Sequence, residues 1–138
     1  MIKNEIKEGL STTFTKEALT SNTIYHTGTS EGVLDYLVST TAVIELIIEI
    51  SSEMLNPLLP DDYITVGKKI ELSHEKATLL GEPLTFALKV AKIEGENIFL
   101  DITVNDSIGV VCRGKYERVI VNKEELISNA YKRSAKAL

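Results

Sequence analysis

The chain has 138 residues, of which 43% are hydrophobic and 25% are charged, and its formal net charge is −5. These values are ordinary for a soluble globular domain with one hydrophobic core. The net negative charge disfavours a nucleic-acid-binding protein, which needs a basic surface. No apolar run approaches the roughly 18 residues of a membrane span, and the N-terminus lacks the apolar region of a signal peptide. We therefore expect a single cytoplasmic domain over residues 1–138, with no nucleic-acid or membrane partner.

The sulfur and imidazole side chains are few. The single cysteine, Cys112, cannot form an internal disulfide, which fits a reducing cytoplasm. Because it lies in an apolar stretch, we expect a buried small hydrophobic residue rather than a nucleophile. Two histidines and no cysteine pair provide no metal-ligand set, and we expect no cofactor.

The N-terminal quarter predicts a strand, a loop and a helical turn. The threonine-rich residues 10–18 predict the strand, and residues 23–26 are compatible with a short extension of it. Residues 26–32 predict a loop, and residues 33–37 predict a short helical turn that leads into the next element.

A strongly apolar helix is predicted from Ala42 to Leu55. The polar residues that interrupt it are Glu45, Glu49, Ser51, Ser52 and Glu53. One of Ser39, Thr40 and Thr41 should cap the helix, and Pro57 should stop it. A helix this apolar is expected to be wrapped by other structure rather than to lie on a surface.

Four strands and a helix are predicted after Pro60. Alternating apolar residues or long apolar stretches place the strands at about residues 63–74, 84–90, 98–104 and 108–121. If the first strand has no bulge, the residues that share its face are Ile64, Val66, Ile70, Leu72 and His74. Asn122 and Glu125 match a capping box that opens a polar C-terminal helix.

This order of elements predicts an α+β fold in which an antiparallel meander wraps around one helix. It is the order of the hotdog architecture. Hotdog subunits normally pair, so that two sheets join and two active sites form at the interface.

Several short motifs bracket the predicted core. They are Ser39-Thr40-Thr41-Ala42, Pro57-Leu58-Leu59-Pro60, Val66-Gly67, Leu72-Ser73-His74, Gly81 and Gly114-Lys115-Tyr116-Glu117-Arg118. In their order and spacing, the chain resembles the fluoroacetyl-CoA thioesterase family of hotdog enzymes, from about Phe14 to the C-terminal helix. The resemblance implies a homodimeric acyl-CoA thioesterase, for which a small acyl-CoA thioester is the substrate and not a cofactor.

The resemblance also implies a set of working residues. The family uses a threonine at the helix start, a histidine on the next strand and a glycine backbone N–H. These fall on Thr40, with Thr41 as the neighbouring possibility, on His74 and on Gly67. Such groups could polarise the thioester carbonyl, attack it and transfer its proton.

The family also uses a glutamate on the helix, and here the sequence departs from the pattern. The aligned position is Ile48, with Glu49 one residue beyond. Glu49 is eight residues after Thr41 and shares its helix face, which favours Thr41 and Glu49 as a pair. On so apolar a helix, we expect desolvation to raise the pKa of Glu49 toward the range of a general base.

Each candidate also has an ordinary structural interpretation. The hydroxyl residues can be a helix cap, Gly67 can mark a bulge, and the three glutamates can form a solvated face. His26 is more typical of a loop surface. His74 is harder to explain in this way, because an ionisable group on the helix-facing side needs a partner. Basic residues that either meet coenzyme A phosphates or are ordinary surface charges are Arg113, Lys115, Arg118, Lys132 and Arg133.

Three functions are compatible with these features. An acyl-CoA thioesterase is favoured by the threonine, glycine and histidine. A hotdog module that binds acyl-CoA without hydrolysing it is the alternative, favoured by the shifted glutamate. A hotdog dehydratase is disfavoured, because it would need an Asp close to His74 in sequence.

Overall fold

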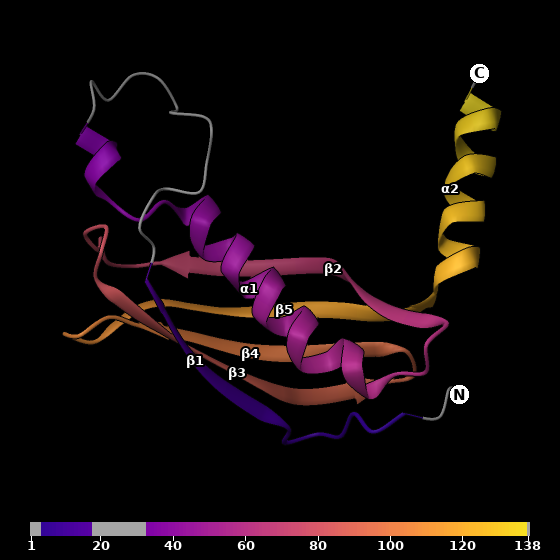
Figure 1. Ribbon diagram of the computed structural model, residues 1–138, viewed down its shortest axis with the longest axis horizontal. Helices are drawn as coiled ribbons and strands as arrows, with labels where there is room; N and C mark the ends of the chain where they lie inside the picture. Colours follow the sequence, from indigo (N-terminus) through magenta and orange to yellow (C-terminus); the bar gives the residue numbers. More distant parts are fainter. Residues whose placement is uncertain (1–3, 18–32, 138) are drawn as a thin grey trace.

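The computed structural model describes residues 4–17 and 33–137. An antiparallel sheet curves around one helix, and a second helix extends from the C-terminal end (Figure 1). The elements are β1 (Ser11–Glu17), the 3-10 helix η1 (Val33–Tyr36), α1 (Thr40–Leu55), the 3-10 helix η2 (Asn56–Leu58), β2 (Tyr63–His74), β3 (Pro83–Glu94), β4 (Asn97–Asn105), β5 (Val110–Asn122) and α2 (Lys123–Ala137). The predicted α+β fold is confirmed. The predicted extension at residues 23–26 and the loop at 26–32, including His26, lie outside the described residues.

The sheet has the strand order β1-β3-β4-β5-β2, so β1 and β2 form its two edges. Strands β3 and β4 alternate between buried and more exposed residues as predicted, with Phe86 and Val104 fully buried between them. Within the described residues, no helix is long and apolar enough to cross a membrane.

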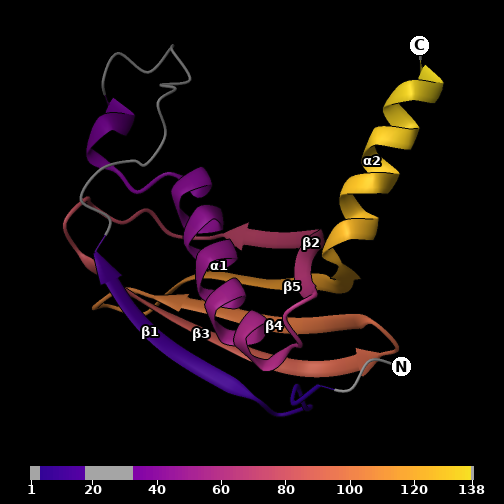
Figure 2. The same ribbon diagram turned by 45° about the vertical axis from the view of Figure 1, so that its right-hand side comes forward.

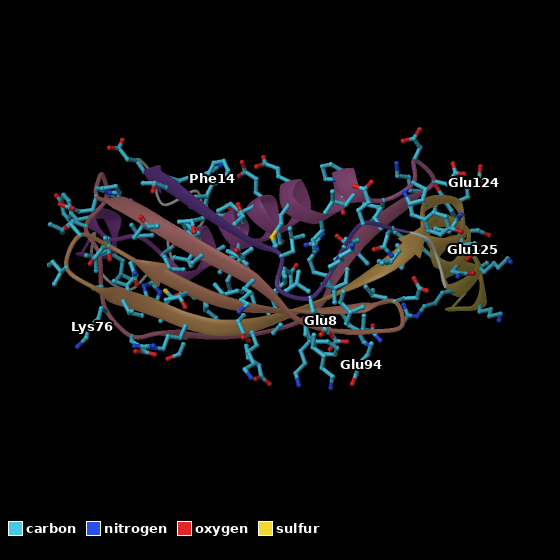
Figure 3. The ribbon with its side chains drawn as sticks, turned by 90° about the horizontal axis from the view of Figure 1, so that it is seen from below. Glu8, Phe14, Lys76, Glu94, Glu124 and Glu125 are labelled. Atoms are coloured by element: carbon cyan, nitrogen blue, oxygen red, sulfur yellow. The ribbon has the colours of Figure 1, made fainter. Side chains whose placement is uncertain are left out.

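Helix α1 lies against one face of the sheet and leaves the other face uncovered (Figures 1 and 3). Its buried residues are Ala42, Val43, Leu46, Ile47, Ile50, Ser51 and Leu55. Ser39 is the N-cap, and its Oγ accepts a hydrogen bond of 3.0 Å from the Ala42 N–H. The opposite side of α1 carries three exposed glutamates and Ile48, which is 43% exposed. The sheet therefore wraps around one side of α1, as predicted, and in one subunit the opposite side of the helix stays exposed.

A β-bulge between Gly67 and Lys69 interrupts the pairing of β2 with β5. Before the bulge, the buried Thr65 faces α1, and after it Ile70 and His74 face α1. The condition of an uninterrupted strand is therefore not met, and Ile64 and Val66 do not share the face of His74. One extra residue reverses the alternation of side chains along the strand.

Candidate active site

Thr40 and His74, two of the residues predicted for the site, lie in contact. The Oγ1 atom of Thr40, the first residue of α1, is 2.8 Å from Nδ1 of His74, the last residue of β2. In the single subunit Thr40 is exposed and His74 is half-buried, so the pair opens toward solvent. A hydroxyl and an imidazole at this distance can exchange a proton.

Backbone hydrogen bonds connect the segment before Thr40 to the loop after His74. The N–H of Val38 donates to the Thr78 carbonyl at 2.9 Å, and the N–H of Leu80 donates to the Tyr36 carbonyl at 2.9 Å. Between these bonds, Leu37 and Leu79 form an isolated antiparallel bridge. The segment that enters α1 is thus tied to the loop that leaves β2, which places Thr40 beside His74.

The helix start adds a positive electrostatic end to this pair. The first N–H groups of an α-helix have no partner within the helix, and the aligned peptide dipoles give this end a partial positive charge. Because Thr40 is the first residue of α1, its hydroxyl lies at that end. Partial negative charge that develops on a carbonyl oxygen here would be stabilised.

Glu49 and Thr41 do not form the pair that the helix periodicity favours. Glu49 Oε1 accepts an ion-paired hydrogen bond of 2.6 Å from Nζ of Lys16 on β1, and the Glu49 side chain is 49% exposed. Eight residues separate the two along α1, roughly 12 Å at about 1.5 Å per residue. The two residues lie on the same helix face, but they are too far apart along the helix to be in contact. The structure brings Thr40, rather than Thr41, to His74.

Gly67 lies far from His74 in the same subunit. The two residues are seven positions apart along β2, which corresponds to roughly 23 Å at about 3.3 Å per residue. A Cβ atom at Gly67 would collide with the hydroxyl of Tyr116, which comes close because glycine has no side chain. Gly67 therefore sits at a bulge beside Tyr116, as one of the structural interpretations predicted.

The sequence did not predict that the charged side chain of Arg118 is buried. Arg118 is only 2% exposed, and its five hydrogen bonds within the described residues all go to neutral oxygens. Its guanidinium carbon also lies 5.5 Å from the centre of the Tyr116 ring. The acceptors are Thr65 Oγ1 at 2.9 Å, Ser51 Oγ at 3.2 Å, Tyr116 OH at 3.0 Å, Ser52 Oγ at 3.0 Å and the Thr65 carbonyl at 2.8 Å. Burial lowers the pKa of Arg118, because the charged form loses hydration.

The position of Arg118 decides whether this residue can meet the phosphates of coenzyme A. It ties the second half of α1 to β2 and β5, so it does not meet the phosphates of coenzyme A. The signal in the sequence was the pair of serines at positions 51 and 52 on an otherwise apolar stretch. The basic candidates that stay exposed are Arg113, Lys115, Lys132 and Arg133.

Cys112 is fully buried, as predicted. Burial, with the negative charge of Glu75 acting in the same direction, raises the pKa of its thiol to about 11. The thiol is therefore neutral at physiological pH and unsuited to nucleophilic chemistry.

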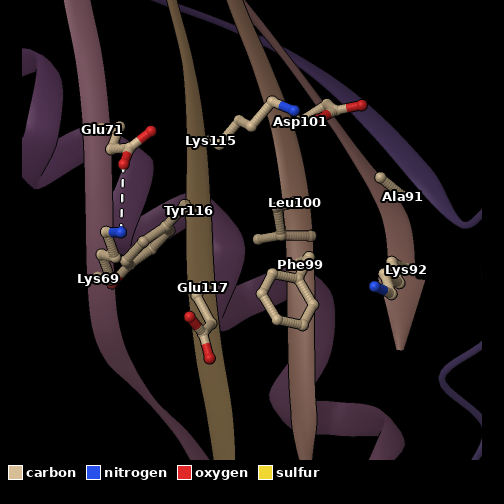
Figure 4. A pocket seen from close by; sticks show the side chains of 10 residues that line it. All are labelled: Lys69, Glu71, Ala91, Lys92, Phe99, Leu100, Asp101, Lys115, Tyr116 and Glu117. Carbon is tan, nitrogen blue, oxygen red and sulfur yellow. Dashed lines mark ion pairs between the residues drawn. The ribbon is translucent and has the colours of Figure 1, made fainter. Parts of the chain in front are cut away.

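A hollow of about 380 Å³ lies on the face of the sheet that α1 leaves bare (Figure 4). Its lining includes Phe99 and the ion pair between Lys69 and Glu71, at 3.2 Å. Neither Thr40 nor His74 contributes to it, so it is separate from the candidate site. Within the described residues, no three His, Cys, Asp or Glu side chains are grouped as metal ligands would be.

Solved structures with the same fold cover almost the whole chain. A hot-dog-like protein from Thermanaerovibrio acidaminovorans is 28% identical, with a TM-score of 0.82 over 91% of each chain. The fluoroacetyl-CoA thioesterase FlK is 18% identical, with a TM-score of 0.82 over 93% of this chain and 97% of its own. A Thermus thermophilus member of the thioesterase superfamily is 19% identical, with a TM-score of 0.79 over 97% and 98%.

The comparison with curated protein sequences gave no match. The family of fluoroacetyl-CoA-specific thioesterases matches residues 19–124, which include both Thr40 and His74. This match extends over most of the 138 residues and agrees with the fold and with the contact between the two side chains. The chain therefore belongs to the fluoroacetyl-CoA-specific thioesterase family, and it is a thioester hydrolase of the hotdog fold.

Proposed function

We propose that this chain hydrolyses a small acyl-CoA thioester, with Thr40 and His74 as the reacting groups. The observation that carries the proposal is the 2.8 Å contact between Thr40 Oγ1 and His74 Nδ1 at the start of α1. A threonine hydroxyl is a weak nucleophile unless a base lies next to it, and His74 is that base. Imidazole is suited to this task because its unperturbed pKa lies near 6.5.

In the proposed reaction, Thr40 Oγ1 attacks the thioester carbonyl carbon as its proton passes to His74. Collapse of the tetrahedral adduct breaks the C–S bond, and His74 returns the proton to the departing coenzyme A sulfur. Water, deprotonated by His74, then hydrolyses the acyl-threonine ester and releases the carboxylic acid. The N–H groups of the first turn of α1 stabilise the negative oxygen of both tetrahedral adducts.

A coupled thiol-release assay across short, branched and aromatic acyl-CoA thioesters tests this function. We expect turnover with at least one small acyl group, and the ranking gives the acyl specificity. Fluoroacetyl-CoA belongs in the panel, but its selectivity does not follow from family membership. Tight binding of acyl-CoA without thiol release would indicate a non-catalytic binding module instead.

We further propose that the working unit is a homodimer joined along β2. Among the described strands of one subunit, β2 is an edge strand that pairs with β5 alone, and an open strand edge favours pairing with another strand. A two-fold partner on this edge would cover the Thr40–His74 pair and approach the exposed Ile48. Sedimentation at micromolar concentration should give a dimer, and a stable monomer would contradict this proposal.

Such a dimer also supplies a role for Gly67. In an antiparallel pair of identical strands, the numbers of facing residues add to a constant. If Gly67 faces His74 of the partner subunit, that constant is 67 + 74 = 141, and the two-fold axis passes between Ile70 and Glu71. The Gly67 N–H of one subunit would then lie near the reacting groups of the other, which a single subunit cannot achieve.

Replacing Thr40 and Thr41 by valine separates the hydroxyl from the shape of the side chain. We expect Thr40→Val to lower kcat by roughly 100-fold or more, because the attacking hydroxyl is lost. Thr41→Val is the matched control, since Thr41 is exposed and Ser39, not Thr41, caps the helix. Thr40→Ser should keep part of the activity. Equal kcat values for the two valine variants would remove Thr40 from the reaction.

The structure also changes what we expect of Glu49. Its carboxylate is half exposed and paired with Lys16, so Glu49→Gln should lower kcat far less than Thr40→Val does. Loss of this exposed ion pair should cost at most about 1 kcal/mol of stability. Steady-state kinetics and urea unfolding check both expectations. If Glu49→Gln instead abolishes turnover and leaves acyl-CoA binding intact, Glu49 is the base that the sequence favoured.

A further inference from the structure

Helix α2 makes little contact with the rest of its own subunit. Every described side chain from Lys123 to Lys136 is exposed, including Leu126 at 38%, Ile127 at 57% and Tyr131 at 75%. Ile127, Tyr131 and the small residues Ala130 and Ser134 follow the i, i+3, i+4, i+7 spacing of one helix face. Isolated helices of about 12–15 residues are marginal in water, so a helix of this length needs a packing partner.

The direction of α2 shows where that partner must lie. Its start is fixed beside the start of β2, where the Lys123 N–H donates to the Asp62 carbonyl at 2.9 Å. From there the helix runs past the free edge of β2, away from the other four strands (Figures 1 and 2). It therefore projects into the space that a partner subunit on the β2 edge would occupy.

The opposite end of β2 exposes a second apolar group. Tyr36 and Leu34 of η1 are 72% and 49% exposed, and Leu79 in the loop after β2 is 58% exposed. These residues belong to the segments whose backbone bonds place Thr40 beside His74. Figure 3 shows the charges at the two ends, with Lys76 in the loop after β2 and Glu124 and Glu125 on the first turn of α2.

A two-fold axis through the middle of β2 brings these two ends together. With facing residues that add to 141, Asp62 of one subunit lies opposite Leu79 of the other, and Asp62 is where α2 begins. Moving the axis by one residue along β2 shifts the facing residue by two, so an axis within one residue of this position still places Asp62 opposite the loop between β2 and β3.

We propose that α2 is an arm that packs on the partner subunit, with Ile127 and Tyr131 covering the partner's Leu79 and η1. The inference rests on the proposed homodimer and goes beyond it. Each arm closes one side of the partner's Thr40–His74 pair, so each active site is built from two chains. Removing the arm therefore affects a reaction whose catalytic groups belong to the other subunit.

Cysteine cross-linking tests the arm directly in the full-length chain. Within one subunit, Tyr131 and Leu79 lie at opposite ends of β2, a strand of 12 residues and roughly 40 Å at about 3.3 Å per residue. A disulfide between cysteines at these positions must therefore join two chains. The native Cys112 does not interfere, because it is buried and its thiol has a raised pKa.

We expect Tyr131→Cys/Leu79→Cys to give a covalent dimer after mild oxidation, seen on a non-reducing gel. Asn129→Cys/Leu79→Cys is the control, because Asn129 lies about 160° from Tyr131 around α2 and lines a pocket with Tyr63 and Ile120 of its own subunit. If the double variant sediments as a dimer but does not cross-link, the proposed position of α2 is wrong, while the homodimer and thioesterase proposals stand.

If the protein sediments as a monomer, both the homodimer and the proposed position of α2 are wrong. If Tyr131→Cys cross-links without Leu79→Cys, the two α2 helices contact each other instead.

Steady-state kinetics provide a second test of the same contact. Ile127→Glu places a charge in the covered stripe, whereas Asn129→Glu adds the same charge on the other face of α2. We expect the first to raise KM for the acyl-CoA and the second to leave it unchanged. Equal KM values for the two variants, measured on dimers, would show that α2 does not contribute to the site.

Discussion

We expect the His74→Ala variant to lose roughly 100-fold or more in kcat, because removing a general acid–base usually costs that much. In the structure His74 Nδ1 is the atom that meets the Thr40 hydroxyl, at 2.8 Å. Without the imidazole, the base that takes the proton of Thr40 is lost. The acid that gives this proton to the coenzyme A sulfur is lost with it. KM should change much less, because neither step concerns ground-state binding.

The control for this variant is the neighbouring Ser73→Ala. Ser73 is exposed and points to the opposite side of β2, so its loss should leave kcat and unfolding unchanged. Circular dichroism and urea unfolding should show that His74→Ala keeps the fold, since His74 is the last residue of its strand. Full turnover by His74→Ala would exclude the proposed mechanism, whatever the effect of Thr40→Val.

The largest loss of stability is expected for Arg118→Ala, at about 3–5 kcal/mol. Arg118 is 2% exposed and makes five hydrogen bonds, which link Ser51 and Ser52 of α1 to Thr65 and Tyr116 in the sheet. Truncation to alanine breaks these bonds and opens a cavity between the helix and the sheet. Arg118→Met should cost less than Arg118→Ala, because it fills the space and avoids burying a charge.

The matched control lies on the same strand. Arg113 also belongs to β5, but its side chain is 62% exposed and its contact with Glu75 is 3.6 Å. Arg113→Ala should therefore cost less than about 1 kcal/mol. Urea unfolding with a common m-value measures both changes, and equal losses would show that the buried network contributes little to stability.

The sequence by itself determined the order and type of nearly every described element. Alternation of apolar residues located β3 and β4, and the capping pattern located the start of α2, where the Glu125 N–H donates to Asn122 Oδ1 at 3.0 Å. These signals are local, because burial on one face of a strand or helix imposes a fixed period on the residues. The resemblance to a thioesterase family, and not periodicity, pointed to Thr40 and His74 as candidates at the ends of two elements.

Only the tertiary structure decided which candidates meet. Periodicity along α1 favoured Thr41 and Glu49, but a shared helix face does not bring together residues two turns apart. The bulge at Gly67 and the turn of Glu49 toward Lys16 depend on neighbouring strands that are distant in sequence. Arg118 looked like a surface cation for the same reason. Its hydroxyl partners come from α1, β2 and β5, and only folding brings these elements around one guanidinium.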